Sequence, residues 1–361
     1  MFAEVSEFVQ SALDGFHVTL FSYGQTGSGK THTMQGLRSA ELKGIIPRAM
    51  EQVGICKRGL EQEGWQYEME VSMLEIYNET IRDLLRDDAT ENTSYDIKVD
   101  SKTGERSVTN LNRMPLDPSD VVAINRVMET AAKYRSVGAT GMNQTSSRSH
   151  SVFTLHLKAV HSGLKQRIKG TLNLVDLAGS ERLDRSGATG AMAKETAAIN
   201  KSLSSLTGVF AAIGKKAAHI PFRNSKLTYL LQPSFSGNGK TLMMVNLSPT
   251  FASYSESLSS LRFAKQVNQC ELGKAKKSLS VDVSNETNDD MSISSNSTSG
   301  SSSGRLTSTT GRKPGTSSIR RPAARSTART TGSQARPMTG KSSQKHGAST
   351  PASRSVRPRN R

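Results

Sequence analysis

Apolar residues recur at helical spacing from the start of the chain. The pattern is carried by Phe2, Val5, Phe8, Val9, Ala12 and Leu13. Steps of three and four residues place such side chains on one face of an α-helix, and Gly15 follows as a stop signal. We therefore expect a helix that begins almost at Met1.

Five apolar runs farther along the chain predict β-strands, and helical patterns lie between them. Strands are expected at 17–23, 67–77, 151–160, 168–177 and 240–248. Helices are expected at 44–60, 118–136, 193–213, 224–232 and 255–270. Alternating strands and helices predict a three-layer α/β domain, in which a mostly parallel central sheet is flanked by helices.

A glycine-rich loop follows the first expected strand. Gly24, Gln25, Thr26, Gly27, Ser28, Gly29, Lys30 and Thr31 fit G-x-x-x-x-G-K-[ST], the pattern of a phosphate-binding P-loop. Glycines let successive backbone N–H groups point into one concavity that binds an anion. Lys30 is expected to neutralise the β- and γ-phosphates, and the Thr31 hydroxyl to bind Mg²⁺. The alternative is an ordinary Gly/Ser loop with a chance lysine, which the strand before it and the helical pattern after it disfavour.

Two further strings suit a nucleotide site. "VDLAGSER" (Val175–Arg182) ends an apolar strand with Asp176, which is expected to hold Mg²⁺ through water, and Gly179 would let a backbone N–H approach a γ-phosphate. The alternative for this string is a common Asp-x-x-Gly turn. "NQTSSRSHS" (Asn143–Ser151) is either a polar loop with a helix cap or, in a P-loop protein, a switch that supplies a Mg²⁺ ligand.

Charge divides the chain into a body and a tail. The net charge is +17 over 361 residues, and the segment from Arg305 to Arg361 holds fourteen Lys or Arg and no acidic residue, so residues 1–304 carry +3. From about Ser278 the chain is rich in Ser, Thr, Asn, Gly and Pro. Such a segment buries too little apolar surface to offset its ordering entropy. We expect a folded domain at 1–272 and a disordered basic tail at 273–361.

Several classes of protein are disfavoured. The two cysteines, Cys56 and Cys270, lie far apart, which favours a reducing compartment over a disulfide framework. The first residues lack the basic start and apolar core of a signal peptide. No run approaches 18 apolar residues, so we expect no membrane-spanning helix and no membrane partner.

Together, "GQTGSGKT", "NQTSSRSH" and "DLAGSE", in this order, closely resemble the kinesin motor domain, and "INKSLSSL" (Ile199–Leu206) strengthens the match. The resemblance runs from about residue 2 to 272. "SKLTYLLQ" and "RFAKQVNQCELGKAKK" look most like kinesin-14, the class of C-terminal, minus-end-directed motors. This resemblance implies a microtubule-stimulated ATPase that uses ATP and Mg²⁺, binds tubulin, and works in the cytoplasm on the cytoskeleton, including the spindle.

The resemblance also assigns roles around the nucleotide. Ser147 would join Thr31 as a direct Mg²⁺ ligand, and Ser146 and Asn143 would shape the closed switch I loop.

Further roles concern the second switch. Arg148 would pair with Glu181 when both switches close on ATP, and Glu181 would then relay a proton from the attacking water. Gly179 would sense the γ-phosphate and His32 would have a positioning role. Asn200 would begin the long switch II helix, which carries the nucleotide state to the track.

A set of basic residues would face the negatively charged microtubule. The resemblance places Arg182, Lys194, Lys201, Arg223 and Lys226 near that face. The alternative for each is an ordinary solvated surface charge. For the basic tail the expected partner is again the acidic microtubule, and nucleic acid is the less favoured polyanion.

The sequence also departs from the family pattern. Family motors begin with earlier strands, one of which carries an R-x-R-P segment against adenine, and no such segment precedes Gly24. Kinesin-14 proteins also place a coiled-coil neck before the motor, so a dimer is expected only through sequence missing here. Two interpretations follow: an ATP-driven microtubule motor, or a non-motile microtubule-binding protein whose turnover is impaired because a sheet edge is missing. A P-loop ATPase of another type is a more distant third.

Overall fold

The computed structural model describes residues 1–37, 39, 41–86, 93–137, 147–181, 191–237 and 239–281, without the side chains of 191–198. The strands are β1 (His17–Tyr23), β2 (Trp65–Tyr77), β3 (Thr80–Asp83), β4 (Ile97–Val99), β5 (Arg106–Val108), β6 (Met114–Pro115), β7 (His150–His161), β8 (Gln166–Asp176), β9 (Gly239–Val245) and β10 (Leu279–Val281). The helices are α1 (Phe2–Leu13), α2 (Lys30–Met34), α3 (Ile45–Gln62), α4 (Val121–Val137), α5 (Ala191–Gly214), α6 (Lys226–Leu230), α7 (Gln232–Phe235) and α8 (Tyr254–Asn268), with short 3₁₀ turns η3 (Phe222–Asn224) and η4 (Phe251–Ser253).

One mixed sheet organises the described chain, in the strand order β3-β2-β7-β8-β1-β9. The strand before the P-loop, β1, lies between β8 and β9 and is parallel to both. The other pairings, β7 with β8 and β2 with β7, β3 and β6, are antiparallel. The expectation of a mostly parallel sheet is therefore wrong. The turn at 162–165 joins β7 directly to β8, and so short a connection permits only antiparallel pairing.

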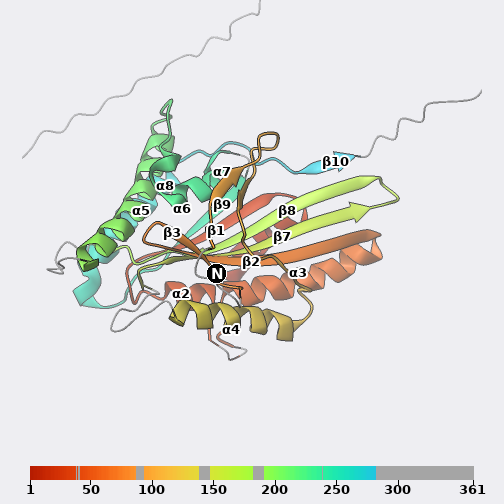
Figure 1. Ribbon diagram of the computed structural model, residues 1–361, viewed down its shortest axis with the longest axis horizontal. Coiled ribbons are helices and arrows are strands. Elements are labelled where there is room, and N and C mark those ends of the chain that lie inside the picture. Colours follow the sequence, from red (N-terminus) through yellow and green to blue (C-terminus); the bar gives the residue numbers. More distant parts are fainter. Residues whose placement is uncertain are drawn as a thin grey trace, which may run out of the picture. The chain divides into compact units, whose positions relative to one another are not determined.

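Helices cover both faces of this sheet, as the sequence predicted. Figure 1 shows α3 and α4 on one side and α5, α6 and α8 on the other. Alternate residues of each strand supply the two cores, since side chains along a strand point to opposite faces. In β1, Val18 and Leu20 pack with α1, α3 and α4, whereas Phe21 packs with α5 to α8. The Phe21 ring stacks on Phe235 at 5.4 Å.

Some local elements differ from the sequence expectation. The helix predicted at 224–232 is split into α6 and α7, and Pro233 lies in the first turn of α7. Proline lacks an N–H and cannot continue a helix interior, which explains the break. The short strands β3 and β6 and the separate β4–β5 hairpin were not predicted.

The folded part extends beyond the predicted boundary at residue 272. Strand β10 pairs antiparallel with β8, so that Leu279 lies opposite Ile168. The Ser278 N–H donates to the Gly15 carbonyl at 2.8 Å, and the Ser278 carbonyl accepts from Lys169 N–H at 3.1 Å. The expectation of disorder is thus wrong for 273–281, whereas the rest of the expected tail lies outside the described residues.

The outer edge of β9 is open. Within the described ranges β9 pairs only with β1. Leu242 and Met244 contact the α3 side of the core and Met243 and Val245 the α5 side, yet all four are only half-buried. None of the described helices combines the length and apolar character that crossing a membrane requires.

Candidate nucleotide site

The P-loop joins the carboxyl end of β1 to α2, and its glycines adopt backbone angles that other residues avoid. Gly24, Gly27 and Gly29 have φ of 151°, 77° and 92°. A Cβ on Gly24 would collide with the Asn246 carbonyl, so this position requires both the absent side chain and the positive φ. The predicted reason for glycine in this loop is therefore supported by its geometry.

Lys30 lies inside this loop rather than in solvent. It is the first residue of α2, is 7% exposed, and its Nζ donates to the Gln25 carbonyl at 2.9 Å. Burial lowers the pKa of Lys30, and the carboxylates of Asp176 and Glu181 act in the opposite direction. The ammonium is thus held at the centre of the loop, close to two negative charges.

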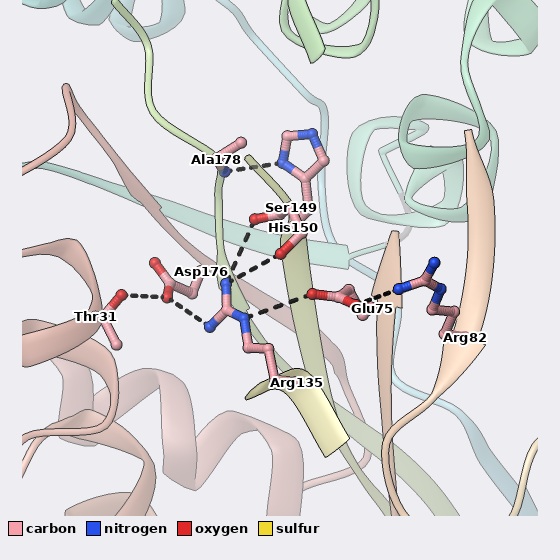
Figure 2. Close-up of polar contacts among 8 residues, drawn as sticks. All are labelled: Thr31, Glu75, Arg82, Arg135, Ser149, His150, Asp176 and Ala178. Atoms are coloured by element: carbon pink, nitrogen blue, oxygen red, sulfur yellow. Dashed lines mark hydrogen bonds and ion pairs between the residues drawn. The ribbon is translucent and has the colours of Figure 1, made fainter. Parts of the chain in front are cut away.

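Thr31 and Asp176, predicted to share a metal ion, lie in contact. Asp176 ends β8, level with Ser22 of β1 and Ser151 of β7. The Thr31 Oγ1 donates to Asp176 Oδ2 at 2.7 Å (Figure 2), while the buried Oδ1 of Asp176 has no hydrogen-bond partner among the described residues. A hydroxyl and a carboxylate are hard oxygen ligands of the kind that Mg²⁺ prefers, so this donor set fits the expected metal.

The "DLAGSE" string forms hydrogen bonds with both the P-loop and the segment that contains Ser147. The Gly179 N–H donates to the Ser147 carbonyl at 2.8 Å, and the Ser180 N–H donates to the Gly24 carbonyl at 3.0 Å. Ser147, the other predicted Mg²⁺ ligand, therefore lies beside the residue predicted to sense the γ-phosphate. These contacts bring the P-loop and both switch segments together.

Glu181 rests on the P-loop. Its carboxylate accepts from the Thr26 backbone N–H at 2.8 Å and from Thr26 Oγ1 at 2.5 Å. A Cβ on Gly179 would overlap with both the Glu181 carboxylate and the Thr26 hydroxyl, so a larger residue here would displace the contact between these two side chains. Arg148 is half-buried, and no ion pair between it and Glu181 is present in the described part of the chain. Pairing of Arg148 with Glu181 remains a prediction for the closed state.

A buried arginine that the sequence analysis missed connects this site to β2. Arg135, near the end of α4, has its Nη1 3.5 Å from Asp176 Oδ2 and its Nε 3.7 Å from Glu75 Oε1. Figure 2 shows the guanidinium between the two carboxylates, with Arg82 on the far side of Glu75 at 3.9 Å. The side chains of Glu75 and Asp176 are 1% and 3% exposed. The single positive charge of Arg135 is therefore shared between two buried carboxylates.

A buried histidine from the "SSRSH" string makes the second unpredicted link. The Ala178 N–H donates to His150 Nδ1 at 3.1 Å, so the proton of a neutral ring lies on Nε2, which contacts Ser202 Oγ of α5 at 2.7 Å. Burial, with smaller contributions from Arg135 and Lys30, lowers the pKa of His150 to about 3. A neutral imidazole thus joins the strand end at Ala178 to α5.

The other predicted residues are distributed as follows. His32 is exposed on α2, and Asn143, Ser146, Arg182 and the Lys194 side chain lie outside the described residues. Asn200 lies within α5, which begins at Ala191, so the expectation that Asn200 starts this helix is wrong.

Three predicted track-facing residues come from α5, η3 and α6, which pack together. Lys201 and Arg223 are exposed, and the Arg223 guanidinium lies 5.6 Å from the centre of the Tyr229 ring. Lys226 is half-buried and pairs with Asp96 at 3.7 Å, so its charge is partly compensated.

Comparison with known proteins agrees with this geometry. The family model described as the kinesin motor domain matches residues 1–270. The Kinesin-like protein KIN-14D of Arabidopsis thaliana is 54% identical over 284 residues, which cover 76% of this chain and 36% of that protein. The chain thus spans about a third of the length of such relatives.

Solved structures give the same result. The motor domain of the kinesin-like protein Kar3 from Saccharomyces cerevisiae is 44% identical, with a TM-score of 0.65 and coverage of 74% of this chain and 79% of that one. A KIF14 dimer, solved with AMP-PNP in complex with a microtubule, is 37% identical, with a TM-score of 0.68 and coverage of 76% of each chain. The resemblance to kinesin-14 is confirmed, and this chain belongs to the kinesin motor-domain family.

Proposed function

We propose that this chain binds ATP with Mg²⁺ and couples ATP hydrolysis to movement along, or force on, microtubules. The observation that carries the proposal is the convergence of three segments at the end of β1. The P-loop cation Lys30, the Thr31–Asp176 pair and the Glu181–Thr26 contact lie around one loop, and the Gly179–Ser147 hydrogen bond joins the third segment to them. Membership of the kinesin motor-domain family supports ATP as the substrate of this site and a microtubule as the partner of the chain.

Within this proposal the P-loop binds the triphosphate and Lys30 neutralises its β- and γ-phosphates. Thr31 and Ser147 would hold Mg²⁺ directly and Asp176 through water, and the ion would supply charge stabilisation to the transferring phosphoryl group. The Gly179 N–H would exchange the Ser147 carbonyl for a γ-phosphate oxygen. Such an exchange would make the switch segments respond to the presence of that phosphate.

Glu181 would change partners during the same transition. In the described arrangement its carboxylate is held by Thr26, at the loop that would receive the phosphates. On closure it would pair with Arg148, and from there relay a proton from the attacking water. Ser146 and Asn143 would complete the closed loop around that water. Phosphoryl transfer depends mainly on positioning and charge, so the geometry of these groups carries the chemistry.

The nucleotide state would reach the track through α5. His150 bonds both Ala178, beside the phosphate sensor, and Ser202 of α5. A shift of the "DLAGSE" segment would therefore displace α5 through this histidine. The neighbouring elements η3 and α6, which pack on α5, carry Arg223 and Lys226. These cations, with Lys201, Lys194 and Arg182, would bind the acidic microtubule surface. The KIF14 complex supports a microtubule as the partner of this chain.

The proposal extends to direction and location, for which the kinesin-14 relatives give support. We infer minus-end-directed movement, in the cytoplasm and on the spindle, because these relatives form the C-terminal motor class. A non-motile microtubule-binding protein is the second candidate, and the observation that favours it is the open edge of β9. A sheet that is incomplete at this edge would bind the track without productive turnover.

The test compares ATP hydrolysis with and without microtubules in wild type, Lys30→Ala and Lys57→Ala. Lys57 is a control because it removes the same charge from α3, where it pairs with Glu61 at 3.0 Å. We expect microtubules to stimulate turnover in wild type and Lys57→Ala, and turnover to be abolished in Lys30→Ala. Full turnover in Lys30→Ala would contradict the P-loop assignment. Co-sedimentation of the wild type without stimulated turnover would instead favour the non-motile candidate.

A further inference from the structure

A second cavity lies at the other end of the strands from the P-loop. It has a volume of about 260 Å³ and lies between the sheet, the β5 strand of the hairpin and the α6–α7 segment. His17, the first residue of β1, lines it, whereas the P-loop follows Tyr23 at the far end of the same strand. The cavity is therefore separate from the nucleotide site.

The sheet face under this cavity changes from apolar to charged in register. Near the P-loop the cross-strand row is Leu74, Val152, Val175, Phe21 and Met243. The next row is Ser72, Thr154, Asn173, Thr19 and Thr241, and the third contains Glu70, His156, Thr171, His17 and Gly239. The last is Glu68, Lys158 and Lys169. A sheet face packed against helices is ordinarily apolar throughout, so the polar and charged rows are unusual for such a face.

The cavity floor offers neutral hydrogen-bonding groups. His156 Nε2 and Ser72 Oγ share a hydrogen bond of 3.1 Å, and Asn173 Nδ2 donates to His17 Nε2 at 3.2 Å. Burial lowers the pKa of His17 to about 4 and is the largest cause that lowers the pKa of His156 to about 3. Both rings are therefore neutral at physiological pH, and each retains one N–H donor.

The rim carries positive charge that the described residues only partly compensate. Lys158 and Lys169 lie directly opposite each other on β7 and β8, an arrangement of like charges that destabilises a sheet. Lys158 has a partner in Glu68 at 3.3 Å. Glu105 also lines the cavity, and the Asp100 carboxylate interacts electrostatically with Lys169, but neither forms an ion pair within 4.0 Å of Lys169 or Arg106 among the described side chains.

Arg106 adds an unsatisfied donor. It reaches from β5 to line the cavity, where its guanidinium lies 5.1 Å from the Tyr229 ring centre and one terminal nitrogen donates to Gln232 Oε1. Its Nε is buried and has no acceptor among the described residues. An acceptor with negative charge would satisfy this donor and relieve the repulsion between the two lysines.

We propose that this cavity is a binding site for a small polar ligand that carries a carboxylate or phosphate group. Lys169 and Arg106 bind the oxyanion, and the hydroxyls and imidazoles of the floor take the remaining polar groups of the ligand. A water-filled gap would explain the polar floor alone, whereas two rim cations without an ion-pair partner among the described residues, Lys169 and Arg106, favour an anion. The proposal does not depend on nucleotide hydrolysis.

The test follows the ring nitrogen signals of His17 and His156 by NMR in the full chain, during titration with citrate and separately with inorganic phosphate. Glutamine variants of each histidine assign the signals. Because these rings lie far along the strands from the P-loop, phosphate that binds at the P-loop does not perturb them directly. We expect saturable shifts with at least one anion, and the two titrations show which oxyanion the site prefers.

Lys169→Ala should raise the dissociation constant at least tenfold. Arg126→Ala is the matched control, because it removes an exposed cation from α4 on the opposite face of the sheet, and it should leave binding unchanged. Shifts that rise linearly without saturation, or that are equal in Lys169→Ala and Arg126→Ala, would overturn the proposal in favour of general ionic screening. The thermal midpoint of each variant verifies that it is folded.

Discussion

Replacement of Arg135 by glutamine tests how much this buried arginine contributes to the free energy of unfolding. The change removes the guanidinium that lies 3.5 Å from Asp176 and 3.7 Å from Glu75, and leaves two carboxylates that are 3% and 1% exposed. Loss of one partner from a buried ion pair costs about 3–5 kcal/mol, because the remaining charge is left without compensation. We expect the free energy of unfolding to fall by that amount.

Urea unfolding followed by circular dichroism measures this loss. With a slope of about 3 kcal/mol per molar urea, the midpoint should fall by about 1–2 M. Arg113→Gln is the matched control, since Arg113 pairs with Glu70 at 3.9 Å but the two side chains are 41% and 25% exposed. An exposed pair of this kind contributes about 0–1 kcal/mol.

A second substitution separates charge from packing. In Arg135→Gln combined with Glu75→Gln, one of the two carboxylates that have lost the guanidinium is gone, so part of the lost stability should return. Glu75→Gln alone leaves Arg135 with Asp176 and remains measurable if the Arg135 variant does not fold. Equal losses for Arg135→Gln and Arg113→Gln, or no recovery in the double variant, would refute the reasoning.

Three further outcomes are expected. Glu181→Ala should keep nucleotide and microtubule binding while hydrolysis slows about 100-fold or more, measured by phosphate release; normal hydrolysis with lost track binding would show that the residue has another role. His17, His150 and His156 have pKa values of about 4, 3 and 3 in the folded chain, against 6.5 for the free group. As pH falls below 6.5, the unfolded chain therefore takes up protons before the folded chain does. The free energy of unfolding, measured with urea, should decrease from pH 6.5 towards 4 by about 1.4 kcal/mol per histidine per pH unit. His156→Gln should reduce that slope, and an unchanged slope would contradict the assignment. Deletion of 305–361 should weaken co-sedimentation with microtubules at low salt and change little at high salt, because exposed charges are screened; no effect at either salt would exclude a role for the basic tail.

The parts of the site that the sequence predicted are those with local signals. The P-loop is a contiguous string whose glycines, lysine and threonine each have a steric or electrostatic reason. Asp176 could be placed because it ends an apolar run, and a strand end brings it level with the loop. The contact of Thr31 with Asp176 spans 145 residues, yet both were found from their own neighbourhoods.

Arg135 was missed because its role depends on two distant partners. It looked like one more polar residue in the helix predicted at 118–136. A signal was nevertheless present: Ile124, Val127 and Ala131 form the buried stripe of α4, and Arg135 continues it one turn later. A charged residue on the buried stripe of a helix needs a partner in the core, but no sequence pattern identifies Glu75 as that partner.

The sequence pattern also did not predict the relative direction of the strands. The apolar runs at 151–160 and 168–177 were found, but alternating strands and helices elsewhere favoured a parallel arrangement. The short turn between these two runs decided the antiparallel pairing. Pro233 was a local signal that the helix predicted at 224–232 would be broken. Because proline lacks an N–H, it is disfavoured in a helix interior and favoured in the first turn of a new helix.

The open edge of β9 has a consequence for the behaviour of the protein at high concentration. Charged residues commonly guard such edges, but Lys240 cannot serve in this way, because its Nζ donates to Ser11 Oγ at 2.8 Å and lies 4.3 Å from the centre of the Phe16 ring. The following run, Thr241 to Asn246, is uncharged and lacks proline and glycine. Such a segment can form β-strand hydrogen bonds with the same segment of another molecule. Preparations of residues 1–281 should therefore form β-rich assemblies by growth at this strand, and a lysine at Met243 should delay their onset.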